Sequence, residues 1–150
     1  MASIKAADQK EWRYWAQISL ELANSLNILI TTLFWTLLAP QLFPHLHWHG
    51  KDLIVIFHLT VIHSLPLISS LTSFYLTDVE YVQKDWKTVG IVGSAYMIAN
   101  YMGQEAMGAP LYPPFLDWTK PVLTFFLFCL MTVIYLVIFH YLAKIKASRR

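Results

Sequence analysis

A histidine and a threonine inside long apolar stretches are the residues of this chain that could form a catalytic pair. His63 and Thr31 lie at about the same depth when neighbouring spans are counted in opposite directions at about 1.5 Å per residue. A neutral imidazole can accept a hydroxyl proton, so His63 could act as a general base and Thr31 as a nucleophile. The alternative is a hydrogen bond between helices, worth about 0.6 kcal/mol on average. The sequence favours this structural role and assigns no catalytic residue.

Three further histidines, His45, His47 and His49, alternate along one short loop. In an extended strand the three imidazoles would share one face, and neutral imidazole is a good ligand for zinc or copper. So short a loop need not be extended, however, and only the carboxylate of Asp52 lies near enough in the sequence to orient such a ligand. We therefore favour a wet loop at the membrane surface and predict neither a metal nor a cofactor.

Four long apolar runs must hold these side chains in place. They cover roughly residues 18–38, 53–76, 88–104 and 122–143, and each approaches the roughly 20 residues that a helix needs to cross a hydrocarbon core of about 30 Å. Of the 150 residues, 57% are hydrophobic, so the runs leave no room for a separate soluble domain. We predict an all-α, polytopic integral membrane protein in which a four-helix bundle forms a single domain over residues 1–150.

The basic residues predict how the chain lies across the membrane. All 11 fall between or outside the apolar runs, and four spans put both termini on one side. The other side has only Lys51 and Lys120. By the positive-inside rule, the termini and the middle loop face the cytosol, or the matrix of a mitochondrion, which is an N-in, C-in topology. The residues on this basic side are Lys5, Lys10, Arg13, Lys84, Lys87, Lys144, Lys146, Arg149 and Arg150.

All six tryptophans lie near predicted ends of spans, where an amphipathic ring prefers the boundary between lipid and water. We interpret them as interfacial anchors: Trp12, Trp15 and Trp86 on the basic side, and Trp35, Trp48 and Trp118 on the other.

Small residues in the third run predict a face for close packing. Gly90, Gly93 and Ser94 would let another helix approach closely. Helix packing is the favoured interpretation, and a slot for a lipid tail is the alternative. The prolines and glycine of residues 108–114 predict an ordered, non-helical connection after this run.

The composition argues against several other classes of protein. The single cysteine, Cys129, cannot form an internal disulfide and has no second cysteine with which to hold a metal. The net charge of +2 is explained by topology alone, so we expect no nucleic acid partner.

The order and spacing of several short motifs resemble the androgen-induced-gene membrane family, whose members include hydrolases of fatty acid esters of hydroxy fatty acids. The motifs are Phe34-Trp35 at the end of a span, His58 eight residues before Pro66, Gly93 followed by Tyr96, and the run Gly-Ala-Pro-Leu-Tyr-Pro-Pro-Phe-Leu at 108–116. The likeness extends over about residues 12–143. It implies the last four of the family's roughly six spans.

The resemblance does not carry the family's catalytic residues onto this chain. The family's threonine nucleophile lies in an amino-terminal part that has no counterpart here. Its catalytic histidine stands five residues before the proline, where this chain has Val61, and His58 matches a neighbouring histidine. His63 would replace the catalytic histidine only if the helix register shifted. Thr31 would replace the nucleophile only if it were recruited to that role.

Two functions follow from these patterns. The first is a non-catalytic accessory subunit that packs against other membrane protein subunits and phospholipids in a larger complex, such as a respiratory complex of the mitochondrial inner membrane. The alternative is a small intramembrane lipid-ester hydrolase of the androgen-induced-gene type, for which the endoplasmic reticulum is the alternative location. Metal or haem binding through the histidines is a third, less favoured reading.

Overall fold

The computed structural model describes the backbone at residues 2–110, 112 and 116–149, and the side chains from residue 9 onward. Four long helices make up most of it: α1 (Ala2–Leu33), α3 (Gly50–Leu76), α4 (Trp86–Met107) and α5 (Pro121–Ser148). The prediction of an all-α protein is confirmed for these residues. Part of the predicted connection at 108–114, namely Leu111, Pro113 and Pro114, lies outside the described residues.

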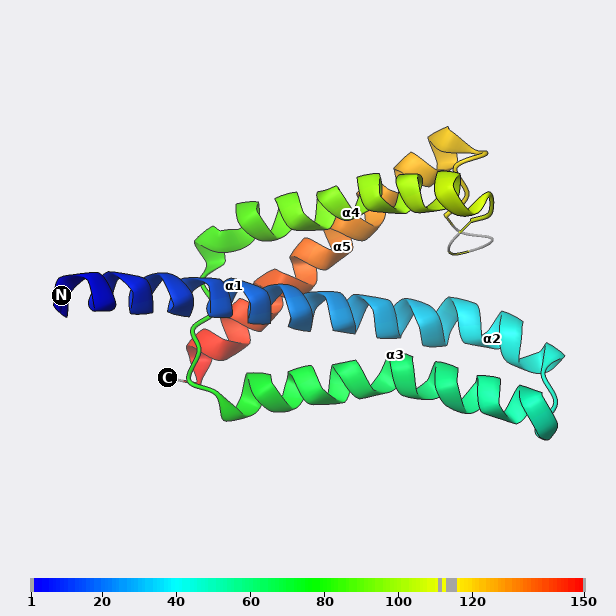
Figure 1. The fold of residues 1–150 in the computed structure, drawn as a ribbon, viewed down its shortest axis with the longest axis horizontal. Coiled ribbons are helices and arrows are strands. Elements are labelled where there is room, and N and C mark those ends of the chain that lie inside the picture. Colours follow the sequence, from blue (N-terminus) through cyan, green and yellow to red (C-terminus); the bar gives the residue numbers. More distant parts are fainter. Residues whose placement is uncertain (1, 111, 113–115, 150) are drawn as a thin grey trace.

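The helices alternate in direction. The start of α1, the end of α5 and the connection between α3 and α4 lie at one end of the molecule, and the other two connections lie at the opposite end (Figure 1). α1 is the central element, because it packs against α3 and α5, while α5 packs in turn against α4. At its amino-terminal end α1 projects past the other helices (Figure 1).

Three helices are long and apolar enough to cross a membrane: Gln9–His45, Gly50–Leu76 and Pro121–Ser148. These fit an integral membrane protein and correspond to three of the four predicted runs. The predicted run 88–104 forms α4, which is not among the three helices with this length and composition in the described part of the chain.

The first span is longer than predicted, and its end was predicted wrongly. The sequence placed the end near Leu38, before Pro40, yet the helix continues through a π-helical turn (Phe34–Leu38) into α2 (Ala39–Leu42) and a 3₁₀ turn (Phe43–His45). Pro40 has no N–H to donate to the preceding turn. The chain widens that turn instead, so that the N–H of Ala39 donates to the carbonyl of Phe34.

A second proline, Pro66, lies inside α3 without ending it. Two side chains of α1 donate hydrogen bonds to the backbone of α3 beside this proline. Asn27 Nδ2 donates to the carbonyl of Pro66 at 3.3 Å, and the hydroxyl of Thr31 donates to the carbonyl of His63 at 2.6 Å. Because a proline interrupts the ladder of a helix, donors from a neighbouring helix stabilise it in lipid.

The end of α3 is held by α5. The ammonium of Lys146, which is buried, donates to the carbonyl of Phe74 at 2.6 Å and also to the carbonyl of Thr77. These carbonyls end the helix and have no partner within it, and a cation there also favours the helix dipole. Around them Phe74, Tyr81, Leu142 and Ala143 form a buried apolar cluster.

The two glycines of the predicted packing face do contact α5. A Cβ added at Gly93 would lie 3.1 Å from Cε1 of Tyr135, and one added at Gly90 would lie 3.6 Å from Cδ2 of Leu136. Ser94, the third member of the predicted face, is exposed. Tyr135 is itself buried with Leu29, Val89 and Phe139, so its ring has little room to yield.

The glycines give a matched test of this packing. Both Gly→Ala changes add one methyl group and raise helix propensity by the same amount. Only in Gly93→Ala does the new methyl group lie closer to a buried ring than ordinary van der Waals contact allows. We expect Gly93→Ala to be less stable than Gly90→Ala by about 1–3 kcal/mol. The measurement is thermal unfolding of both variants in the same detergent. Equal melting temperatures would mean that α4 does not pack on Tyr135 as described.

Candidate functional site

The two candidate catalytic residues lie side by side but are not joined through their side chains. The hydroxyl of Thr31 donates to the backbone carbonyl of His63, not to its ring. The imidazole stacks on Phe34, with ring centroids 3.8 Å apart and planes at 12°. Its Nδ1 is buried without a hydrogen-bond partner in the described residues. This arrangement supports the attachment of α1 to α3 and leaves no base in contact with the hydroxyl.

The loop histidines are exposed at the opposite end from the chain termini. Asp52 accepts hydrogen bonds from the backbone N–H of His47 at 3.0 Å and contacts its Nδ1 at 3.2 Å, and the ring of His49 stands edge-on 5.4 Å from that of His47. His45 lies in the 3₁₀ turn, outside this contact. Within the described ranges, no group of three His, Cys, Asp or Glu residues is placed to hold a metal ion.

The tryptophans lie at both ends of the helices, and most of them are strongly exposed. Trp12 and Trp48 are 77% and 72% exposed, and Trp15 and Trp86 about half. Trp35 and Trp118 differ because they make interior contacts. The indole N–H of Trp35 donates to Ser64 Oγ at 3.2 Å, and that of Trp118 donates to Asn100 Oδ1 at 2.8 Å. These two rings join helices as well as standing near the predicted interface.

The most buried polar cluster of the molecule was not predicted. We define the Glu21 cluster as Gln17, Glu21, Asn24, Ser25, Tyr81, Val82 and Asp85. Glu21, Asn24 and Ser25 have no exposed surface at all. They lie on α1 near the end that carries the chain termini, where α1 meets the connection between α3 and α4.

Hydrogen bonds in the Glu21 cluster fasten that connection to α1. Glu21 Oε1 accepts from the backbone N–H of Val82 at 2.9 Å and from Gln17 Nε2 at 3.2 Å. Gln17 Nε2 also donates to Asp85 Oδ2 at 3.0 Å. Asn24 Nδ2 donates to the hydroxyl of Tyr81, which donates to the carbonyl of Leu20. Each of these bonds joins residues that are far apart in the sequence or closes one turn of α1.

Some oxygen atoms of the Glu21 cluster lack a hydrogen-bond partner among the described residues. Glu21 Oε2, Asn24 Oδ1 and Ser25 Oγ are buried and have no hydrogen-bond partner among the described residues. Burial raises the pKa of the Tyr81 hydroxyl above its ordinary value, so it stays neutral and remains a donor. Glu21 and Asp85 are two carboxyl groups buried in one cluster, which is costly in a membrane and marks a candidate functional site by default.

A signal for this cluster was present in the sequence. Gln17, Glu21 and Asn24 are spaced four and three residues apart, which places them on one face of a helix. Polar residues at this spacing predict a polar face at the start of the first helix but do not identify what that face contacts. The partners Tyr81 and Asp85 lie about 60 residues away, and no periodicity of the sequence connects them with α1.

A second polar cluster anchors the connection between α4 and α5. Gln104 Oε1 accepts from the backbone N–H of Trp118 at 2.9 Å, and Gln104 Nε2 donates to Asp117 Oδ1 at 3.2 Å. Hydrogen bonds from the hydroxyl and the backbone N–H of Thr119 hold the pKa of the Asp117 carboxyl below its usual value. Asn100 and Gln104, both buried on α4, thus bind this connection directly.

Comparison with models of protein families, with curated proteins and with solved structures finds no match to this chain. The resemblance to the androgen-induced-gene family therefore stays a prediction, and the function must be argued from the chain's own geometry.

Substitutions at Glu21 test the buried cluster. Leucine at this position leaves the Val82 N–H without an acceptor, which costs about 1–3 kcal/mol, and it removes one of the two acceptors of the Gln17 amide. Glutamine keeps a carbonyl oxygen in place of Oε1, so the Val82 N–H keeps its acceptor. We expect Glu21→Leu to melt at a lower temperature in detergent than Glu21→Gln. Equal stability of the two variants would show that Glu21 does not fasten the connection.

Proposed function

We propose that the chain is a non-catalytic subunit of a larger membrane assembly, in which it packs against helices of other subunits and against lipid. One observation carries this proposal: the outward face of α3 exposes an ionisable side chain deep in a predicted membrane span. His58 is exposed and lies about 12 Å from the start of α3, counted at about 1.5 Å per residue.

The surroundings of His58 supply no compensation for its polarity. α3 packs mainly against α1, and His58 lies on the face turned away. One to three turns along that face are apolar residues and a serine, all exposed: Ile54, Ile62, Leu65 and Ser69. Ionisable groups within membrane spans nearly always face protein or a water-filled cavity and find a partner there. A helix of another subunit that carries a carboxylate, amide or hydroxyl at this depth would provide one.

The projecting start of α1 supports the same proposal. Trp12, Tyr14 and Trp15 are 77%, 42% and 52% exposed, and every residue of 9–16 is exposed. An isolated helical segment is marginally stable in water. Such a segment with large aromatic side chains is suited to lie against a neighbouring subunit at the membrane surface.

An intramembrane lipid-ester hydrolase is the second candidate. The observation in its favour is the buried, unpartnered Nδ1 of His63, which is free to accept a proton. The Thr31 hydroxyl is engaged elsewhere, so this candidate requires rearrangement of α1 against α3. Hydrolysis of a long-chain fatty acid ester by the purified chain, lost in His63→Asn with the fold intact, would favour it over the subunit.

Within this proposal the chain crosses the membrane four times with both termini on the basic side. α4 is the fourth crossing, and its face at Gly90 and Gly93 packs against α5. The nine-to-two distribution of basic residues between the two ends supports the N-in, C-in orientation.

Replacing His58 tests the subunit proposal. An interhelical hydrogen bond in a membrane is worth about 0.6 kcal/mol on average, or roughly a threefold change in association. We therefore expect His58→Leu to lower the fraction of the chain that comigrates with a large complex on a native gel in mild detergent. His140→Leu is the matched control, since His140 is an exposed histidine on α5 near the opposite end. Migration of the unaltered chain as a lone species would contradict the proposal.

The orientation has its own test. With Cys129 replaced by serine, cysteines are introduced singly at His47 and Lys84, and labelled with a reagent that cannot cross the membrane. Four crossings place these positions on opposite sides, so only one of them should react in sealed vesicles, and both after permeabilisation. Reaction of both in sealed vesicles would place the two positions on the same side and would exclude a single crossing by α3 between the first and second connections.

A further inference from the structure

We propose that the start of α5 binds a phospholipid with a net negative headgroup, with Lys120 contacting the phosphate and the apolar side chains behind it contacting an acyl chain. The hollow that carries this proposal is open, has a volume of about 670 Å³ and is lined by Lys120, Pro121, Val122, Leu123 and Phe126. This inference rests on the chain lying in a membrane and does not depend on its being a subunit.

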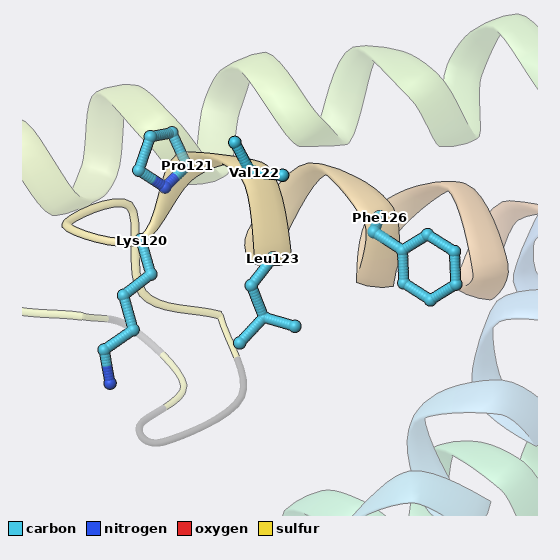
Figure 2. Close-up of a pocket in the computed structure, with 5 residues that line it drawn as sticks. All are labelled: Lys120, Pro121, Val122, Leu123 and Phe126. Carbon is cyan, nitrogen blue, oxygen red and sulfur yellow. The ribbon is translucent and has the colours of Figure 1, made fainter.

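The hollow combines one cation with an apolar wall. Lys120 and Leu123 extend to the same side of the chain, and Phe126 lies one turn further along α5 (Figure 2). Val122 is 83% exposed, Phe126 64% and Leu123 52%. Such exposed apolar side chains next to a single ammonium have the chemistry of a lipid: a charged head at the surface and a tail directed along the helix.

The ammonium of Lys120 is available to an anion. It makes no ion pair and no side-chain hydrogen bond in the described part of the chain. The nearby carboxylate of Asp117 accepts instead from Thr119 and Gln104. The charge of Lys120 helps to lower the pKa of the Asp117 carboxyl from a distance, but its ammonium forms no ion pair by direct contact among the described residues.

Two general considerations make a lysine at this place unexpected without an anion. Basic residues are scarce at this end of the molecule, which has only Lys51 and Lys120. Lys120 also directly precedes the first turn of α5 and makes no side-chain cap, although a cation near the start of a helix is unfavourable to the helix dipole. A phosphate held there would offset this repulsion.

The depth fits a phospholipid better than a soluble anion. Trp118, two residues before Lys120, is half-buried at the predicted interface, and α5 enters its apolar stretch directly after Pro121. The second open hollow at this end is lined by Trp35, Ala39, Pro40, Phe43, Pro44 and Trp48, without a charged residue. It offers a surface to any lipid, whereas the hollow at Lys120 has a basic residue among its otherwise apolar lining.

The test uses the full chain in detergent micelles with equal amounts of phosphatidylglycerol and phosphatidylcholine, read by native mass spectrometry. We expect retained lipid to be enriched in phosphatidylglycerol, and Lys120→Gln to reduce this enrichment about fivefold, the effect expected of one lysine near an anionic surface. Lys120→Arg should keep it. Lys51→Gln is the matched control, because it removes the other lysine of this end, and it should leave the enrichment unchanged.

Three results would overturn the proposal. The first is equal retention of both lipids, and the second is an equal loss in Lys120→Gln and Lys51→Gln, which would indicate a general effect of charge. The third is displacement of the lipid by millimolar inorganic phosphate, which would assign Lys120 to a soluble anion. Leu123→Asp keeps Lys120 but places a charge on the wall, so it should lower retention of both lipids. None of these readouts depends on comigration with a complex, so failure here and failure of the subunit proposal are distinguishable.

Discussion

The need to satisfy backbone carbonyls where a helix is interrupted or ends organises this structure. Hydrocarbon offers no hydrogen-bond donors, so each such carbonyl must find one in the protein. At the end of α3 the neighbouring helix α5 provides this donor, and beside Pro66 the neighbouring helix α1 donates to the carbonyls of His63 and Pro66, next to the interrupted turn. Asn27 and Thr31 come from α1 and Lys146 comes from α5. The contacts of α3 with the other helices are thus polar bonds to its backbone as well as apolar packing.

The same requirement explains why polar residues of α1 are so deeply buried. The connection between α3 and α4 runs back across α1, and its backbone N–H at Val82 has no helical partner. Glu21 supplies an acceptor at the cost of burying a carboxylate, and Asn24 with Tyr81 completes the attachment. Tyr81 belongs both to this polar contact and to the buried apolar cluster around Phe74, so the two are continuous.

Much of the fold could be predicted from the sequence. Both the apolar character and the length of a span are set by the hydrocarbon core that the helix must cross. The predicted run 53–76 nearly coincides with α3 (Gly50–Leu76), and Gly90 and Gly93 lie against α5 as small residues in a span should. The extent of α1 could not be predicted in this way, since hydropathy reports where a helix is apolar and α1 continues through polar residues. The π-helical turn could not be predicted for a similar reason. Pro40 suggests the end of a helix, and only the geometry of the turn shows that the helix widens and continues. The Glu21 cluster depends on pairing with Tyr81, which local patterns do not encode.

The position of Lys146 has a consequence for the making of the protein. Its partner carbonyl at Phe74 precedes it by 72 residues, and a ribosome adds about 5–20 residues per second. The last turn of α3 therefore waits roughly 4–14 seconds for its donor while α4 and α5 are synthesised. During that interval the end of α3 lacks the donor that it has in the folded chain. The attachment of α3 to α5 can therefore form only after residue 146 has been translated.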